Sequence, residues 1–126
     1  MSDEIIAVSL RNLKAMPDER LCDLLKSGVD YIIQSTSDDL LLPTEREVTE
    51  LYFEVQLYAA EGLERGLSCS LEHIARLESH FDSRVRELRR EAPEEANVFN
   101  YFRTTFSTDN IIRVYNAFKA KKIVYP

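Results

Sequence analysis

The chain has 126 residues, of which 44% are hydrophobic and 30% charged, and its formal net charge is −6. This length suits one domain with its own core, and this composition excludes a disordered chain. No apolar run approaches the roughly 18 residues of a membrane span, and the chain does not open with a secretion signal, so a single cytoplasmic domain over residues 1–126 is expected.

Apolar residues recur at helical spacing along nearly the whole chain, which predicts an all-α, single-domain bundle of about six helices. The first helix is expected from residue 3 to residue 14 with Ser2 as its N-cap. The second helix starts at Pro17, whose missing N–H costs nothing in a first turn, and continues to about Gln34. A loop over residues 35–43 follows, in which three consecutive leucines should tuck under the chain.

A long third helix is predicted near residues 45–65. Thr44 and Glu47 form a capping box, in which each side chain satisfies the backbone N–H of the other residue. Gly66 can adopt the left-handed conformation that commonly ends a helix.

Three further helices complete the predicted bundle. Ser70, in preference to Ser68, is expected to cap the fourth helix; Pro93 breaks that helix, and Glu94 and Glu95 open the fifth. Residues 107–109 cap the sixth helix, and an apolar tail ends the chain at residues 123–126. The short connections favour antiparallel packing of these last elements.

The sequence carries no signature of catalysis, of a cofactor or of a metal centre, so a non-enzymatic protein is expected. His73 and His80 lie seven residues apart, roughly 10 Å along a helix, which is too far for one metal ion, and a solvated helix flank is their predicted place. Cys22 and Cys69 lie in different predicted helices and form no CxxC pair, which indicates two buried thiols rather than a zinc site or a disulfide.

Charge is distributed unevenly along the chain. Residues 1–66 carry 14 acidic and 6 basic side chains, and residues 67–126 carry 8 acidic and 10 basic ones. The acidic first half favours solubility or a basic protein partner, and nucleic acid is not the expected partner. The basic side chains near the end of the fourth helix spread around its axis among glutamates and should form local ion pairs: Arg84, Arg86, Arg89 and Arg90. The same role is predicted for Lys119, Lys121 and Lys122.

The predicted long helix carries two apolar lines. Its main line is Val48, Leu51, Tyr52, Val55, Ala59 and Leu63, and its second line is Phe53, Leu57 and Ala60. Four glutamates stand between the lines: Glu50, Glu54, Glu61 and Glu64. Either this helix is central and packed on both sides, or the second line and the glutamates form an interface with another chain, including a second copy in a homodimer.

The layout from Thr44 to about Phe102 resembles that of small all-helical immunity proteins that neutralise bacterial toxins. The shared features are a capped long helix, a serine-capped helix with regular leucines, and a break with acids and a proline before a third helix. The resemblance implies a stoichiometric protein that covers the active surface of a toxin, often through an acidic face. The leading hypothesis is therefore an immunity or inhibitor protein, and the alternative is a small helical dimeric regulator that contacts nucleic acid or another anion through C-terminal basic residues.

Overall fold

The structure, a computed structural model, describes residues 10–37 and 43–120, and all regular structure in these ranges is helical. The helical segments are residues 10–15, α2 (Asp18–Ser35), η1 (Glu47–Tyr52), α3 (Phe53–Glu64), α4 (Ser68–Leu88), α5 (Pro93–Thr105) and α6 (Thr108–Lys119). The all-α prediction is confirmed. The predicted Ser2 cap, the three leucines at 40–42 and the tail at 123–126 lie outside the described residues.

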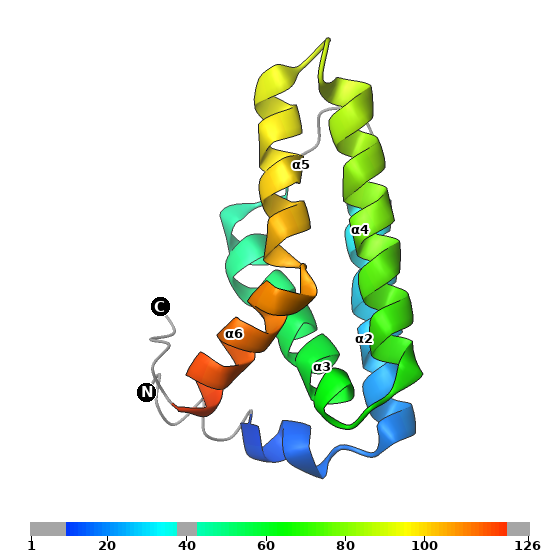
Figure 1. The fold of residues 1–126 in the computed structure, drawn as a ribbon, viewed down its shortest axis with the longest axis vertical. Helices are drawn as coiled ribbons and strands as arrows, with labels where there is room; N and C mark the ends of the chain where they lie inside the picture. The colour runs from blue at the N-terminus through cyan, green and yellow to red at the C-terminus, as the bar shows by residue number, and fades with distance from the viewer. Residues whose placement is uncertain (1–9, 38–42, 121–126) are drawn as a thin grey trace.

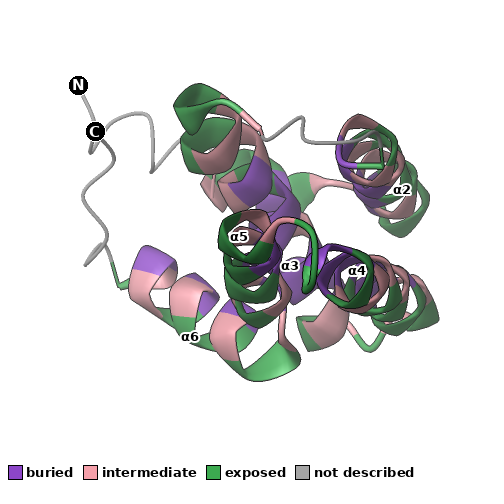
Figure 2. Cartoon of the chain, turned by 90° about the horizontal axis from the view of Figure 1, so that it is seen from above, coloured by how far each residue is buried: buried purple, intermediate pink, exposed green. Residues whose placement is uncertain are grey.

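The helices pack around α3, which runs through the middle of the bundle (Figure 1). Helices α2 and α4 rise in the same direction, while α3 and α5 descend. The predicted antiparallel pairing holds for α4 and α5, but α6 turns away from α5 and packs across α3. Seen from above, the buried residues gather where α3, α4 and α5 meet (Figure 2).

Two glycines let α3 approach its neighbours closely. A Cβ atom built on Gly62 would lie 1.9 Å from Oγ of Ser70 in α4, and one on Gly28 of α2 would lie 2.6 Å from Cγ2 of Val55 in α3. Both helix pairs therefore need a residue without a side chain at the point of contact.

The N-terminal end of the long helix has the predicted capping box and an unpredicted π segment. The N–H of Thr44 donates to Oε1 of Glu47 at 2.9 Å, and the N–H of Glu47 donates to Oγ1 of Thr44 at 3.1 Å. Residues 47–52 then form the π-helical segment η1 before α-helical geometry begins at Phe53. Helical structure is continuous from residue 45 to residue 64, close to the predicted bounds.

The connection from α3 to α4 confirms one prediction and corrects another. Gly66 has φ of 75°, and the N–H of Leu67 donates to the carbonyl of Gly62 at 2.8 Å, so the helix ends in a Schellman motif as expected. The prediction that Ser70 caps α4 is wrong, because α4 begins at Ser68 and its N-cap residue is Leu67. Ser70 is instead buried in the first turn, against Gly62.

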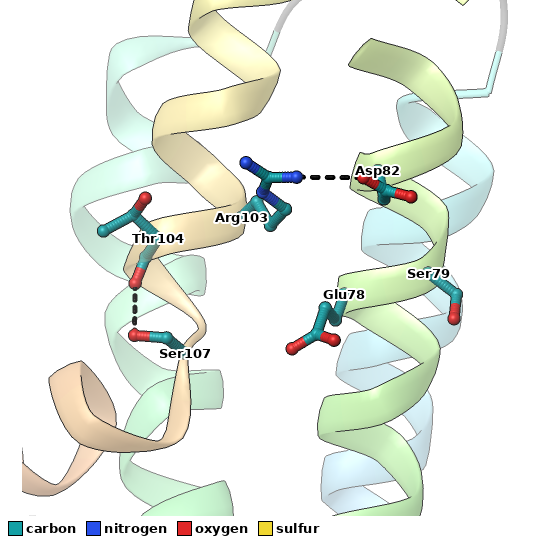
Figure 3. Close-up of a pocket in the computed structure, with 6 residues that line it drawn as sticks. All are labelled: Glu78, Ser79, Asp82, Arg103, Thr104 and Ser107. Carbon is teal, nitrogen blue, oxygen red and sulfur yellow. Dashed lines mark hydrogen bonds and ion pairs between the residues drawn. The ribbon is translucent and has the colours of Figure 1, made fainter. Parts of the chain in front are cut away.

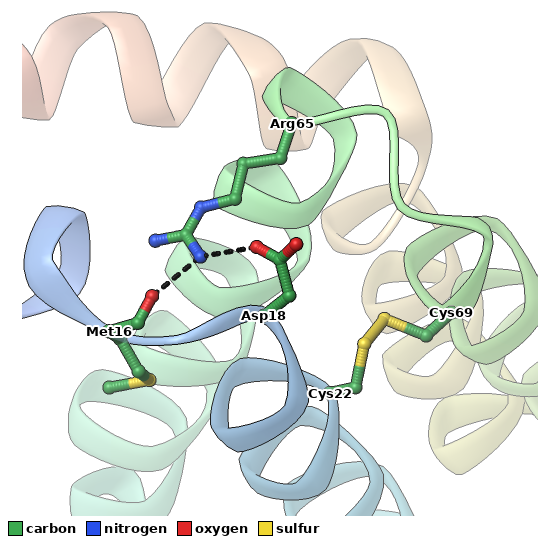
Figure 4. The surroundings of a disulfide bond; sticks show 5 residues. All are labelled: Met16, Asp18, Cys22, Arg65 and Cys69. Atoms are coloured by element: carbon green, nitrogen blue, oxygen red, sulfur yellow. Dashed lines mark hydrogen bonds and ion pairs between the residues drawn. A yellow bond between two sulfur atoms is a disulfide. The ribbon is translucent and has the colours of Figure 1, made fainter.

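The two cysteines are joined, so the prediction of separate thiols is wrong. Cys22 and Cys69 form a disulfide, with their Cα atoms 6.0 Å apart (Figure 4). The parallel course of α2 and α4 places their first turns side by side, although the residues are 47 positions apart in sequence. That proximity is a property of the tertiary packing.

The histidines lie in the contact between α2 and α4, which corrects their prediction as a solvated flank. His73 is only 7% exposed, and its Nδ1 lies 3.0 Å from Nη1 of Arg76. Nε2 of His80 lies 2.7 Å from Oγ1 of the buried Thr36. The Thr36 hydroxyl donates its one proton to the carbonyl of Ile32, so His80 is the donor in this pair.

Candidate protein-binding surface

The second apolar line of the long helix belongs to the core. Leu57 is 6% exposed and Ala60 is 2% exposed, while the ring of Phe53 packs edge-on against Phe118 of α6, with the ring centroids 5.8 Å apart. Helix α6 covers this side of α3, which is why the line needs no second chain. Leu57 and Ala60 are therefore core residues, as the alternative of a central helix expects, and Phe53 lies half-buried beside them.

Glu61, a predicted interface residue, is the centre of a buried ionic network. It is 2% exposed, accepts from Nε of Arg65 at 2.7 Å and from the Tyr115 hydroxyl, and forms an ion pair with Nζ of Lys14 at 3.0 Å. Burial raises the pKa of Glu61, but the hydrogen bonds from Tyr115, Arg65 and Lys14 outweigh it, and the net pKa is lowered. The network joins residues 10–15, α3 and α6, so its role is structural.

Glu64 and Lys119 belong to the same end of the molecule. Nζ of Lys119 lies 3.1 Å from a carboxylate oxygen of Glu64 and 4.7 Å from the centroid of the Tyr115 ring. Lys119 is thus ion-paired, as predicted, but with a residue of α3 that lies 55 positions earlier rather than with a neighbour on its own helix, while Lys121 and Lys122 lie outside the described residues. Glu64 is engaged in these contacts rather than displayed as a free acid.

Arginines of α4 also have local partners. Nη1 of Arg84 lies 2.8 Å from Oε2 of Glu87, and Nη2 of Arg86 lies 3.2 Å from Oδ2 of Asp82. Arg84 is buried, however, with its guanidinium 5.4 Å from the ring centroid of Phe99. It therefore contributes to the core as well as to an ion pair.

The other two predicted glutamates do lie on the surface. Glu50 and Glu54 are exposed, and with Glu45 and the half-buried Glu47 they form what we call the acidic surface, on η1 and the turns that flank it. Arg46 is the one basic residue in this stretch of sequence, and its Nε binds Oε2 of Glu50 at 3.1 Å. The stretch therefore keeps an excess of negative charge.

Tyrosine hydroxyls hold carboxylates of the acidic surface in place. The hydroxyl of Tyr31 in α2 donates to Oε2 of Glu47 at 2.6 Å, and that of Tyr58 donates to Oε1 of Glu54. The hydrogen bond from Tyr31, together with the backbone N–H of Thr44, lowers the pKa of Glu47. Tyr31 is 48% exposed, so its ring forms part of the same surface.

Sequence reasoning missed these tyrosines. Their acceptors Glu47, Glu54 and Glu61 recur every seven residues, which is visible in the sequence. The pairing of Tyr58 with Glu54 has i,i+4 spacing within α3 and is visible in the sequence. Tyr31 and Tyr115 come from α2 and α6, so their pairing with Glu47 and Glu61 could not be read from spacing along one helix.

A polar hollow of about 460 Å³ lies between α4 and the turn that joins α5 to α6 (Figure 3). It is lined by Glu78, Ser79, Asp82, Arg103, Thr104 and Ser107. Nη1 of Arg103 lies 2.9 Å from Oδ1 of Asp82, and the hydroxyls of Thr104 and Ser107 donate to backbone carbonyls. This lining contains no hydroxyl paired with a base, as nucleophilic catalysis requires.

Within residues 10–37 and 43–120, no group of three or more His, Cys, Asp or Glu side chains is arranged to hold a metal ion. None of the helices in these two ranges has the length and hydrophobicity of a transmembrane segment.

Comparisons of the chain with protein-family models, with curated proteins and with solved structures found no match. Function is therefore argued from the surfaces and side chains described above.

Proposed function

We propose that the chain is a non-enzymatic, cytoplasmic protein-binding module that neutralises a basic partner protein by stoichiometric binding, in the manner of an immunity or inhibitor protein. The observation that carries this proposal is the acidic surface, four carboxylates on and beside a π-helical segment. The toxin class of the partner follows from the resemblance in layout alone.

The π segment supports a functional role for this surface. Six residues of η1 depart from α-helical geometry near the N-terminal end of a helix that is otherwise regular to Glu64. Such segments are rare, and they recur at functional sites because they are less favourable than the α-helix and are retained where they re-aim side chains. Here the segment carries Glu47 and Glu50 of the acidic surface.

The hydrogen bonds of the acidic surface favour binding by preorganisation. Glu47 is held by Tyr31 and Thr44, and Glu54 by Tyr58, so these carboxylates lose little conformational freedom when a partner docks. The exposed ring of Tyr31 adds the kind of side chain that dominates interface energies. An excess of negative charge steers a basic partner and raises its association rate.

The test uses, as the probe, the protein encoded immediately upstream of this chain in the native genome. We expect a 1:1 complex by light scattering, an affinity that falls with added salt, and rescue of growth when both proteins are expressed together. Charge reversal by Glu50→Lys and Glu54→Lys together should weaken the complex at least tenfold, because repulsion replaces attraction on an exposed surface.

Glu72→Lys and Glu91→Lys together supply the matched control, since both residues are exposed and neither belongs to the acidic surface. This control makes the same change in net charge and should retain binding. Loss of affinity in both double variants, or no binding by the wild-type chain, would contradict the proposal. Thermal melting of each variant establishes that it is folded.

A further inference from the structure

The disulfide joins two sulfur atoms in different surroundings. Cys69 is the second residue of α4, and Cys22 lies in the second turn of α2. Both residues are half-buried, so a small thiol in solvent can reach the bond without unfolding the chain. No other disulfide or free cysteine exists, because the sequence contains two cysteines.

The first turn of α4 favours a thiolate at Cys69. Leu67 precedes the helix and provides no side-chain hydrogen bond, and the first turn contains no acidic residue. The positive end of the helix dipole and the unpaired N–H groups of the first turn therefore stabilise negative charge on this sulfur.

The surroundings of Cys22 oppose a thiolate. Asp18 and Glu19 lie four and three residues before it in the same helix, on its side of α2. Because Asp18 is paired with Arg65 at 2.9 Å, the like charge near Cys22 comes mainly from Glu19. Like charges disfavour ionisation, so Cys22 is the poorer leaving group of the pair.

The disulfide also stands beside the contacts that hold the N-terminal part of the chain. Nη1 of Arg65 donates to the carbonyl of Met16 at 2.6 Å and to Oδ1 of Asp18 at 2.9 Å (Figure 4). Farther along α2, the ties to α4 are polar, Asp30 with Arg76 and Thr36 with His80. The disulfide is the covalent link between these two helices, and it joins the second turn of α2 to the first turn of α4.

We infer that Cys22–Cys69 is an exchangeable redox staple, opened by a dithiol that attacks Sγ of Cys22 and expels Cys69 as a thiolate. The attacking sulfur forms a mixed disulfide with Cys22 as the Cys22–Cys69 bond breaks. The second thiol of the dithiol, as its thiolate, then displaces Cys22, which leaves as a thiolate. The dithiol is oxidised to its cyclic disulfide, the cystine gains two electrons, and the protons lost by the dithiol go to solvent or to the released sulfurs. Disulfides in cytoplasmic proteins are usually transient and either catalytic or redox-sensing. A redox-sensing role for Cys22–Cys69 therefore rests on the cytoplasmic location proposed above.

The direction of attack is tested on the folded wild-type protein with glutathione, a monothiol that has no second thiol to resolve the mixed disulfide within the same molecule, so that the first product can be trapped. Brief exposure, rapid alkylation of free thiols and peptide mass mapping should place glutathione on Cys22 and the alkyl group on Cys69. Glutathione found mainly on Cys69, or no exchange until urea unfolds the chain, would overturn the inference.

A matched pair of variants tests whether the N-terminal end of α4 sets the rate of exchange at the disulfide. Ser68 is exposed at the first position of α4, so Ser68→Asp adds a carboxylate beside Cys69, and Ser68→Asn adds a side chain of the same size without charge. The aspartate should slow exchange roughly two- to fivefold, which corresponds to the usual worth of a charge at a helix end, and the asparagine should leave the rate unchanged. Equal rates in both variants would show that the helix end does not set the reactivity.

The effect of breaking the disulfide on the structure is measured by hydrogen exchange of the backbone amides after full reduction of Cys22–Cys69. Protection should fall in residues 10–25, which the disulfide and the Arg65 contacts hold together, while α5 stays protected. Unchanged protection in residues 10–25 would contradict the role as a staple. None of these measurements uses a binding partner, so their failure is distinct from failure of the proposed binding function.

Discussion

Two tyrosines of the core differ in what their hydroxyl groups contact. The hydroxyl of Tyr115 donates to Glu61, and burial with this contact raises the pKa of Tyr115 to about 12. The hydroxyl of Tyr52 is buried with no hydrogen-bond partner among the described residues, while its ring packs edge-on against Phe102 with the centroids 5.2 Å apart. Tyr52 thus stabilises the core through its ring, whereas its oxygen loses hydration without compensation.

Removing each hydroxyl should therefore have opposite effects. Tyr52→Phe should leave the free energy of unfolding unchanged or raise it by up to about 1 kcal/mol, because an uncompensated buried group is deleted. Tyr115→Phe should lower it by about 1–3 kcal/mol, because Glu61 loses a donor. Urea unfolding of the two variants makes the comparison, and an equal loss of stability in both would show that the Tyr52 hydroxyl has a partner.

Helix α3 shows how an element is defined by its neighbours as well as by its own sequence. Its capping box and its glycine end are local, and both occur where the sequence predicts them. Its burial on several sides comes from α2, α4 and α6, which pack around it. Contact with α4 is closest at Gly62, where the backbone of one helix meets Ser70 of the other.

Gly62→Ala tests this closest contact. Alanine favours a helix by about 1 kcal/mol over glycine, so an unhindered site would gain stability. At residue 62 the new Cβ would meet Oγ of Ser70 at 1.9 Å, and overpacking should instead lower the free energy of unfolding by roughly 1–3 kcal/mol.

The matched double variant adds Ser70→Ala, which removes the oxygen and leaves Cβ of residue 70 at 3.1 Å. It should recover part of the stability lost in Gly62→Ala. A Gly62→Ala protein as stable as the wild type, or a double variant less stable than the single one, would contradict the packing described here.

At the scale of the whole molecule, the contacts around α4 differ in kind. Its contact with α5 is rich in aromatic rings, such as Phe81 packed against Phe99 and Phe102. Its contact with α2 includes the disulfide and two histidines, His73 and His80. Acid should therefore weaken the contact between α4 and α2 before it affects the contact between α4 and α5.

The pKa values of both histidines are lowered from 6.5, chiefly by burial and then by Arg76 beside His73 and Arg84 beside His80. Well above pH 6.5 both histidines are neutral in the folded and unfolded states. As the pH falls below 6.5 the unfolded chain takes up protons first, so the free energy of unfolding should fall until the lower folded pKa values are passed. Glu61, whose pKa is lowered from 4.5, contributes to pH dependence only in more acidic solution.

Urea unfolding between pH 8 and pH 5 measures this slope. His80→Gln should remove part of it, because glutamine can still donate to Thr36 but does not titrate in this range. If the free energy of unfolding of the wild type did not change over this pH range, the attribution of the pH dependence to the histidines would be contradicted. The same change with pH in His80→Gln as in the wild type would also contradict it.

The sequence by itself determined the all-α class and most helix ends, because these depend on local signals. Apolar periodicity, the Thr44–Glu47 capping box, the Gly66 turn and the Ser107 cap act within a few residues, and each is observed. It also placed four glutamates between the two apolar lines, of which Glu50, Glu54 and Glu64 are exposed and Glu61 is buried.

Only the tertiary packing explains why the second apolar line is buried as well as the first, why the two cysteines meet and where the histidines lie. Leu57 and Ala60 are buried because α6 packs over them, and Cys22 reaches Cys69 because α2 and α4 run parallel. His80 is covered because Thr36, 44 positions earlier, ends α2 beside it. Each of these contacts joins residues far apart along the chain, and helical periodicity reports which face is apolar but carries no information on what covers it.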